Sequence, residues 1–299
     1  MIIKIILTCI VILTTACMLG MLYKVKKQTA INISLKERIK LFSCGIVAFV
    51  ADTIGVGSFA VNTALAKMLN TFKDEELPAM NNGAQVLPGA ISAFFFITAV
   101  DVDLTTLLTL VIGTCVGGVI GGGVVSHFNR QAIRVTMMSC FSLIATLLVL
   151  RKFELIPIGG DDVALHSWKL VVGFLGMAMC GILSSAGVGL FALVQGVLFL
   201  LGMSPIVAFP IMMTAGAMQQ PLTTMMFLRS DKIPLRKTLI LTLGGCIGVV
   251  LVLPIFKYLT ASWLHGLLLT ILLYNIYAIS KAYFKSRNSE VTITNQEAA

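Results

Sequence analysis

Hydrophobic residues occur along this chain in long runs that short polar stretches separate. Most runs are close to the length of about 20 residues that an α-helix needs to cross the hydrocarbon core of a bilayer. The pattern predicts an all-α, polytopic membrane protein, with no stretch between the runs that would form a separate soluble domain. The predicted helical segments are 5–22, 41–66, 83–100, 104–126, 132–150, 169–201, 205–228, 236–256 and 263–280.

Two of these segments differ from the others because glycine and polar residues interrupt them in the middle. Segment 41–66 contains Gly55-Val56-Gly57-Ser58, and segment 169–201 contains Gly187-Val188-Gly189. A glycine in a helix interior costs about 1 kcal/mol relative to alanine, so each pair is expected to break its helix in mid-membrane. Two geometries fit this pattern: a single kinked crossing, or a re-entrant hairpin that returns to its own side.

The sequence also repeats itself at an offset of about 131 residues. At this offset the two glycine pairs coincide, residues 113–117 meet residues 244–248, and in both halves three further segments follow the broken one. Such a period predicts two structural repeats. The predicted organisation is a transmembrane helix and basic cytoplasmic loop at 1–40, repeat 1 at 41–152, a connecting loop at 153–168, repeat 2 at 169–284 and a polar tail at 285–299.

The distribution of charge bears on how the two repeats are oriented. The acidic link 101–103 precedes one hydrophobic segment, and Arg130 and Arg134 follow it. Because basic loops stay in the cytoplasm, this favours re-entrant first segments, three crossings per repeat and therefore inverted repeats. Arg151 and Lys152 favour the alternative, in which both first segments span and the repeats run parallel. Both alternatives place the N-terminus outside and the C-terminus in the cytoplasm.

Composition agrees with a membrane protein and excludes several other classes. Of 299 residues, 58% are hydrophobic and 12% are charged, whereas soluble domains carry about 25% charged residues. The net charge of +9 comes from bases in loops and tails without interleaved aromatic residues. Such bases reflect the orientation of a membrane protein and do not indicate nucleic-acid binding. The seven cysteines lie inside hydrophobic runs with no C-x-x-C spacing, and catalytic motifs are missing, so we expect no cofactor, no metal site and no enzyme.

The first segment, residues 5–22, has the length of a secretory signal peptide. A signal peptide carries its bases before the hydrophobic stretch, but here only Lys4 precedes the stretch and six bases follow it. We therefore expect a retained first helix, which stands outside the two repeats.

The two breaks are the first candidates for a substrate site. Unwound backbone in mid-membrane is tolerated only inside protein or around a cavity, and a helix N-terminus suits an anion. Nearby amides and hydroxyls can bind an oxyanion without a permanent charge, although helix packing and interhelical hydrogen bonds are the alternative roles. The candidate substrate-binding residues are Gly55, Gly57, Ser58, Asn62, Asn82, Gln85, Gly187, Gly189, Gln195, Gln219 and Gln220.

Asp52 is the only acidic residue well inside a hydrophobic segment, and it lies beside the first break. A buried carboxylate in a membrane helix is costly and usually faces a cavity, so Asp52 is a candidate proton carrier. The alternative is a capping or hydrogen-bonding role at the break. Its counterpart in the second repeat is Ser184, so any role of the acid is asymmetric.

The repeated glycine elements resemble the TauE/SafE family of membrane permeases, often called sulfite exporters. The resemblance rests on GIVAFVADTIGVGSFAVNTALAKML at 45–69 and GMAMCGILSSAGVGLFALVQGVLFLLGM at 176–203, and it extends over about residues 41–285. It implies inverted repeats and export of sulfite or organosulfonate-like anions. The chain departs from the family because the usual glycine triplet is thinned in each half, and the following proline is replaced near Asn62 and near Gln195. These changes fall where the resemblance places the substrate, so the transported anion can differ from sulfite.

Together, the residues and the resemblance predict a secondary transporter of small anions of the sulfite, organosulfonate or carboxylate type, located in a cell membrane. It would work by alternating access, with Asp52 as the candidate for proton coupling. A passive anion channel and a non-transporting membrane assembly or partner protein are the alternatives. The expected partners are the small anion and the lipid bilayer, with no nucleic acid, and homo-oligomerisation is left open.

Overall fold

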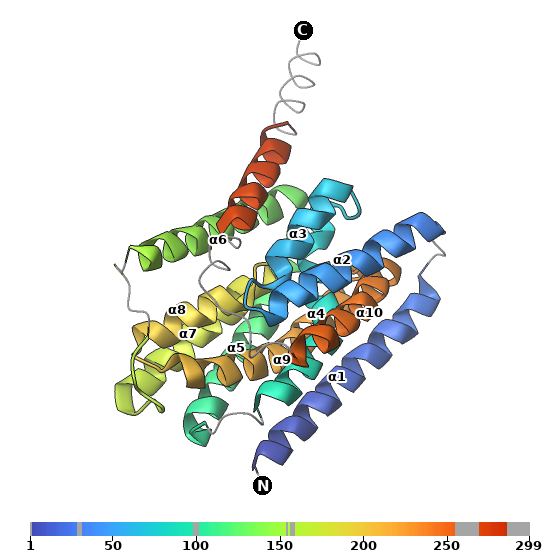
Figure 1. Cartoon of the computed structure of the whole chain (residues 1–299). Helices are drawn as coiled ribbons and strands as arrows, with labels where there is room; N and C mark the ends of the chain where they lie inside the picture. Colours follow the sequence, from blue (N-terminus) through green and yellow to red (C-terminus); the bar gives the residue numbers. More distant parts are fainter. Residues whose placement is uncertain are drawn as a thin grey trace.

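A computed structural model describes residues 2–28, 32–97, 102–153, 155, 159–254 and 269–285. Within these ranges every regular element is helical, which confirms the predicted all-α class (Figure 1). The elements are α1 (Ile2–Lys27), α2 (Leu35–Thr53), α3 (Ser58–Leu69), the 3-10 helix η1 (Asp74–Glu76), α4 (Leu77–Ile97), α5 (Leu104–Val125), α6 (Arg130–Lys152), α7 (Ser167–Ser185), α8 (Leu190–Leu200), α9 (Pro205–Arg229), α10 (Leu235–Val252) and a helix at 269–285.

Parts of several sequence predictions lie outside the described residues. These are residues 1 and 29–31 of the region 1–40, the ends of segments 83–100 and 236–256, the first residue of the acidic link 101–103, part of the connecting loop 153–168, the beginning of segment 263–280 and nearly all of the polar tail 285–299.

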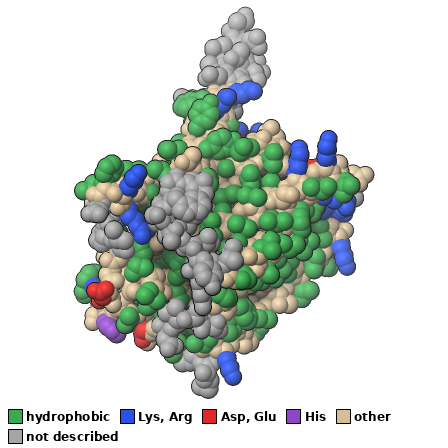
Figure 2. Space-filling view, viewed as in Figure 1, with side chains coloured by type: hydrophobic (Ala, Val, Ile, Leu, Met, Phe, Trp, Pro, Cys, Tyr) green, Lys and Arg blue, Asp and Glu red, His purple; other side chains and the backbone are tan. Residues whose placement is uncertain are grey.

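Five of the described helices, α1, α5, α6, α7 and α10, are long and apolar enough to cross a membrane. Their outer faces expose large apolar side chains, such as Ile12 of α1, Ile120 of α5, Val171 of α7 and Leu251 of α10. Figure 2 shows a broad apolar surface with Lys and Arg side chains mostly along its upper right border. A surface of this extent is stable in lipid and not in water, so the chain is a membrane protein.

The first interrupted segment folds into a hairpin of two helices, α2 and α3, and is not a kinked crossing. Lys237, near the start of α10, links the two outer ends of the hairpin. Its ammonium group pairs with Glu37 in the first turn of α2 (2.8 Å) and donates to the backbone carbonyl of Thr71 just beyond α3 (2.8 Å). The hairpin therefore enters and leaves at the same end of the molecule.

Ion pairs of Lys and Arg gather at this end, which we call the basic end. Lys24 at the end of α1 pairs with Asp231 between α9 and α10 (2.6 Å). Arg130 at the start of α6 pairs with Glu75 of η1 (2.6 Å). The basic end therefore gathers the ends of α1, α3, α5 and α9 and the beginnings of α2, α6 and α10.

The second interrupted segment, α7 and α8, folds into a hairpin that opens at the opposite end. Asp162 joins its outer ends, because its backbone N–H donates to the carbonyl of Gly202 beyond α8 (3.1 Å) and its carboxylate accepts from Lys169 of α7 (2.7 Å). The loop before α7 also contacts the start of α5, where the N–H of Leu165 donates to the Thr106 hydroxyl (2.9 Å). Figure 1 shows the two hairpins extending from the middle of the molecule in opposite directions.

Each hairpin packs against a helix of the other half of the chain. α7 lies along α5, and α2 lies along α10, while α4 and α9 form the centre. Both seams depend on glycine: a Cβ on Gly117 would lie 1.9 Å from the carbonyl oxygen of Ala178, and a Cβ on Gly248 would lie 2.5 Å from that of Ile46. These two contacts join equivalent positions of the sequence repeat. The glycines of α5 and α10 therefore form close helix-packing seams.

Candidate functional site

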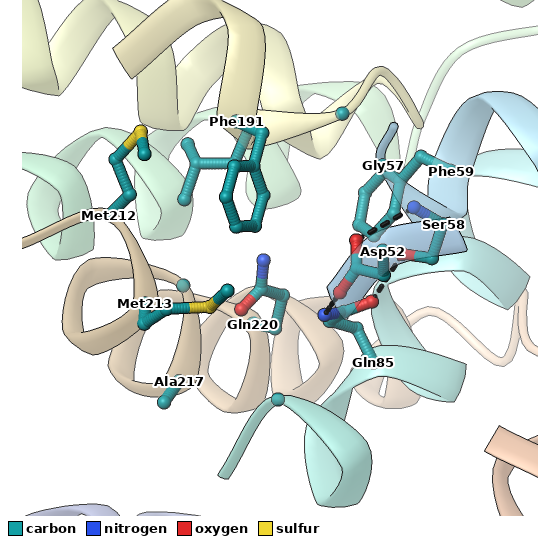
Figure 3. A pocket seen from close by; sticks show the side chains of 14 residues that line it. Asp52, Gly57, Ser58, Phe59, Gln85, Phe191, Met212, Met213, Ala217 and Gln220 are labelled. Carbon is teal, nitrogen blue, oxygen red and sulfur yellow. Dashed lines mark hydrogen bonds between the residues drawn. The ribbon is translucent and has the colours of Figure 1, made fainter. Parts of the chain in front are cut away.

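The tips of the two hairpins meet at a narrow buried cavity in the middle of the molecule (Figure 3). Its volume is about 20 Å³, and a water molecule requires at least about 10–15 Å³ on this scale. In this conformation the cavity therefore admits little more than one water molecule. Its lining comes from both tips and from α4 and α9, and consists of Asp52, Gly57, Ser58, Phe59, Gln85, Gly89, Gly189, Leu190, Phe191, Met212, Met213, Gly216, Ala217 and Gln220.

The first tip owes its shape to two glycines in the left-handed region of φ. Gly55 has φ of +94° and Gly57 has φ of +88°, conformations that residues with a Cβ adopt only with strain. This reversal directs the first turn of α3 toward the cavity. The backbone N–H of Ser58 then donates to the carboxylate of Asp52 (2.7 Å). Asp52 thus caps α3 from the preceding helix, and its negative charge offsets the positive end of the α3 dipole.

Asp52, Ser58 and Gln85 form a closed hydrogen-bonded ring. The side-chain amide of Gln85 donates to the second carboxylate oxygen of Asp52 (2.7 Å), and the Ser58 hydroxyl donates to the amide oxygen of Gln85 (2.5 Å). Asp52 is only 3% exposed, so both of its oxygens depend on these donors. The ring supports the hydrogen-bonding role foreseen for Asp52, while its role as a proton carrier stays a prediction.

The second tip has a similar backbone but no equivalent cap. Gly187 has φ of +86°, and α8 begins at Leu190 after its N-cap, Gly189, which has no side chain to cap the helix. Ser184 occupies the position of Asp52, and its buried hydroxyl has no hydrogen-bond partner within the described part of the chain. The position that supplies the capping carboxylate in the first tip therefore holds a hydroxyl in the second, and the first residues of α8 line the cavity.

Gln220 of α9 is the cavity residue whose polar group is left unsatisfied. It is 3% exposed, and its amide oxygen has no hydrogen-bond partner among the described residues. Figure 3 shows its side chain pointing into the space between Phe191 and the first tip. Gly216, one turn earlier, makes room for it, because a Cβ there would lie 3.1 Å from the amide oxygen. A buried amide oxygen without a partner is costly, so this oxygen is available to a hydrogen-bond donor of a ligand.

α4 holds the two tips together through a pair of asparagines. The amide of Asn81 donates to the Thr63 hydroxyl of α3 (3.0 Å) and to the Gly187 carbonyl of the second tip (3.2 Å). Asn82 donates to the carbonyl of Pro78 (2.9 Å) and, more weakly, to that of Ser184 (3.4 Å). These side chains fix the relative position of the two tips and do not line the cavity.

Six of the twelve predicted site residues come together at the cavity: Asp52, Gly57, Ser58, Gln85, Gly189 and Gln220. The other six are Gly55, Asn62, Asn82, Gly187, Gln195 and Gln219, and none of them belongs to its lining. Gln195 instead accepts a hydrogen bond from Arg151 of α6 (2.8 Å), and Gln219 donates to Thr223 within α9. Asn62 is buried, and both polar atoms of its side chain are without partners in the described ranges.

Sequence reasoning missed the apolar walls of the cavity, chiefly Phe59, Phe191, Met212 and Met213. A signal for the two phenylalanines was present: each follows its Gly-x-Gly element by two residues, so they occupy equivalent positions of the repeat. Phe191 is held by an edge contact with Phe209 of α9 (5.7 Å between ring centroids). These side chains keep water away from the polar groups and strengthen their electrostatic interactions.

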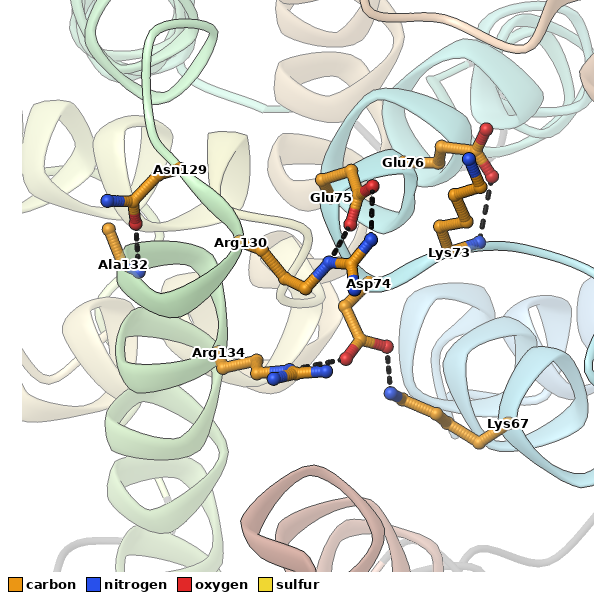
Figure 4. Close-up of polar contacts among 9 residues, drawn as sticks. All are labelled: Lys67, Lys73, Asp74, Glu75, Glu76, Asn129, Arg130, Ala132 and Arg134. Atoms are coloured by element: carbon orange, nitrogen blue, oxygen red, sulfur yellow. Dashed lines mark hydrogen bonds and ion pairs between the residues drawn. The ribbon is translucent and has the colours of Figure 1, made fainter. Parts of the chain in front are cut away.

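A second polar cluster lies at the basic end, outside the cavity (Figure 4). Asp74 of η1 accepts hydrogen bonds from Lys67 of α3 and from Arg134 of α6 (2.5 Å for Arg134), and Glu75 accepts two from Arg130 (2.6 and 2.8 Å). Burial by itself raises the pKa of Asp74, but the hydrogen bonds and charges of its two bases outweigh burial and lower the pKa. The cluster ties the exit of the first hairpin to α6.

Within the described residues, no three His, Cys, Asp or Glu side chains lie close enough together to hold a metal ion. Searches of protein-family models, curated proteins and solved structures each returned no match for the chain.

Proposed function

We propose that this protein is a secondary transporter of small anions that works by alternating access. One observation carries the proposal: two helical hairpins from opposite ends of a membrane protein meet at a buried cavity that the first residues of α8 and the amide of Gln220 line. Discontinuous helices that meet at mid-membrane are a recurrent way to build a transport site.

The charges around the cavity favour an anion. The N–H of Ser58 at the start of α3 is matched by Asp52, whereas the start of α8 has a hydroxyl residue, Ser184, in the equivalent position and lines the cavity together with Gln220. Backbone N–H groups of α8 and the Gln220 amide are hydrogen-bond donors without a full positive charge. Such donors bind an oxyanion and still permit its release. The apolar walls and the volume of about 20 Å³ favour a small anion, whose entry requires the tips to move apart.

Opposed hairpins also suggest how access would alternate. The first hairpin opens at the basic end and the second at the opposite end, and equivalent glycine contacts hold each of them to the other half. We propose inverted repeats with the basic end in the cytoplasm of a cell, the N-terminus outside and the C-terminus inside. Movement of one hairpin at a time would then expose the cavity to one side. Protonation of Asp52 is the proposed coupling step, because it would weaken the capping of α3.

The resemblance of the glycine elements to the TauE/SafE family supports the same proposal. It adds sulfite, organosulfonates and related carboxylates as the substrates to try first.

The test is substrate-evoked charge movement in proteoliposomes on a solid-supported membrane, with sulfite, sulfate, organosulfonates and small carboxylates at two pH values. Gln220→Glu keeps the size of the side chain but puts a negative charge in the cavity, so we expect it to abolish the currents. Gln195→Glu adds the same charge beside Arg151, which can pair with it, so this control should transport normally. Saturable currents in the wild type and control alone would support the proposal.

Other results would contradict it in different ways. Currents in Gln220→Glu equal to those of the wild type would exclude the cavity as the anion site. Currents that never saturate would indicate a channel. Silence with every anion, together with counterflow assays that detect no electroneutral exchange, would favour a non-transporting partner protein.

A further inference from the structure

Two further cavities lie at the basic end, beside the outer ends of the first hairpin, and share no lining residue with the cavity at the tips. The larger, about 460 Å³, lies among α1, α10 and the turn after α3, and the smaller, about 300 Å³, lies between α1, the start of α2 and α10. Both are walled by Ile33 and by the guanidinium-bearing side chain of Arg236 in the first turn of α10. They are therefore neighbouring spaces on either side of one arginine.

Arg236 lines both cavities, has no acidic partner among the described residues and carries a buried polar atom without a hydrogen bond. Lys24, Lys237 and Arg130 each pair with an aspartate or glutamate at this end. No ion pair or hydrogen bond joins Arg236 to another residue in the described ranges, and its Nε atom is buried. The buried Nε is a hydrogen-bond donor without a partner, which is costly, and the rest of this partly exposed side chain borders the two cavities, so an anionic group seated there would complete it.

Further positive charge surrounds this arginine. Lys26 and Arg38 line the smaller cavity, and Lys73 and Lys237 line the larger one. The acid that lines them, Glu76, is engaged by the backbone N–H of Lys73 (2.8 Å). Even after the pairing of Lys237 with Glu37, the two cavities keep an excess of positive charge.

The remaining walls are apolar and lead to the outer surface of the molecule. Val25, Leu239 and Ile240 line the smaller cavity. Along the same helices toward the middle of the molecule, Leu22 of α1 and Leu243 of α10 expose large apolar side chains. A cationic pocket at a helix end that continues into an apolar helix surface has the two-part chemistry of a phospholipid: a phosphate at the base and acyl chains along the helices.

We propose that Arg236 and the two cavities beside it form a binding site for the phosphate group of an anionic phospholipid, seated between α1 and the start of α10. Arg236 donates to the phosphate oxygens, Lys26 and Arg38 add to the positive field, and the acyl chains lie on the apolar faces of α1 and α10. The site is independent of the anion cavity and of whether the protein transports anything.

Native mass spectrometry of the detergent-purified full chain tests this proposal, with phosphatidylglycerol and phosphatidylcholine added in equal amounts. The wild type should retain phosphatidylglycerol in preference, and Arg236→Gln should weaken that retention on the order of tenfold, as expected for the loss of a charge-assisted hydrogen bond. Arg229→Gln is the matched control, because Arg229 is an exposed arginine at the same end that lines neither cavity. It should retain phosphatidylglycerol like the wild type.

Two further variants keep the test decisive if Arg236→Gln proves unstable. Arg236→Lys keeps the charge but loses the guanidinium fork, and Lys26→Gln removes a charge at an exposed position of the smaller cavity. Both should weaken retention by a smaller factor than Arg236→Gln. Equal retention of both lipids by the wild type, or equal loss in Arg229→Gln and Arg236→Gln, would overturn the proposal.

A soluble phosphate is the other source of the same chemistry, and a second measurement separates the two. If inorganic phosphate at millimolar concentration raises the thermal unfolding temperature in an Arg236-dependent manner, and phosphatidylglycerol does not, the lipid assignment is wrong. Stabilisation by phosphatidylglycerol, with no effect of phosphate or phosphatidylcholine, is the expected result.

Discussion

Gly117→Ala gives a direct test of the glycine seam between α5 and α7. In the wild type the backbones of the two helices touch at this point, and an added Cβ would lie 1.9 Å from the carbonyl oxygen of Ala178. Gly123 lies on the same helix, and a Cβ there would meet no atom within 4 Å. Gly123→Ala is therefore a matched control that makes the same chemical change on the outer surface of α5.

The cost follows from the distance that must be gained. To bring the Cβ of residue 117 to even 3.0 Å from the carbonyl oxygen, α5 and α7 must separate locally by about 1 Å. A gap of about 0.5–1 Å forfeits a quarter to a half of the dispersion attraction of the atoms that line it. Overpacking of this kind typically costs about 1–3 kcal/mol. Both variants gain up to about 1 kcal/mol of helix propensity, so their difference isolates the overpacking cost.

Unfolding of the purified protein in detergent measures this difference. We expect Gly117→Ala to unfold at a lower temperature than the wild type, and Gly123→Ala to unfold at the same or a slightly higher temperature. Because α7 carries the second hairpin, transport by Gly117→Ala should also fall. Equal unfolding temperatures for the two variants would refute the close contact of α5 with α7 and with it the packing of the second hairpin.

Three further predictions concern the tips and the basic end. Asp52→Asn keeps the size of the side chain, and reversal of the Gln85 amide would restore the hydrogen-bonded ring. We therefore expect the free energy of unfolding to change by less than about 1 kcal/mol. The pH dependence of the currents should disappear. In Gly187→Ala the alanine would have to adopt φ of +86°, and its Cβ would lie 2.9 Å from a backbone atom of α4. In Gly55→Ala the unfavourable φ, which costs about 1–3 kcal/mol, is the one source of strain, because a Cβ there would meet no atom within 4 Å. Gly187→Ala should therefore lower the unfolding temperature more than Gly55→Ala. The pKa of Asp74 is lowered overall, because the effect of its two bases exceeds the opposite effect of burial. The ion pairs of Asp74 therefore stabilise the protein above about pH 4, and this stabilisation is lost as pH falls through the lowered pKa. Asp74→Asn should destabilise the protein at pH 7 and reduce the acid-side loss of unfolding temperature, and an unchanged pH profile would show that the ion pairs contribute nothing.

The hydrophobic pattern located most helices because the bilayer dictates both their length and their apolar surface. The segment predicted at 104–126 is α5, Leu104–Val125, and the segment predicted at 205–228 is α9, Pro205–Arg229. The breaks were also predictable, since φ near +90° at Gly55 and Gly187 is a conformation that a glycine adopts without strain.

Two helix beginnings were not predictable from hydropathy. α4 begins at Leu77, well before the predicted residue 83, because Asn81 and Asn82 look like loop residues but are fully buried and donate hydrogen bonds to the backbone of the second hairpin. α2 begins at Leu35, inside a stretch expected to be a loop, and Ser34 caps it through the N–H of Glu37 (3.2 Å). Polar residues that are satisfied only by tertiary contacts leave no hydrophobic signal.

The choice among the candidate glutamines could not be made from the sequence either. Gln195 and Gln220 are both amides in apolar segments of the second repeat, yet one accepts a hydrogen bond from Arg151 and the other points into the cavity. What separates them is the rotation of each helix about its axis and the position of α6, and both depend on the packing of the whole bundle.

The exchange of partners between the halves has a consequence for how the chain reaches its folded state. α2 of the first half packs on α10 of the second, and α7 of the second half packs on α5 of the first, so one half alone would leave its glycine-lined faces uncovered. We therefore expect the two halves to become stable together and not one at a time.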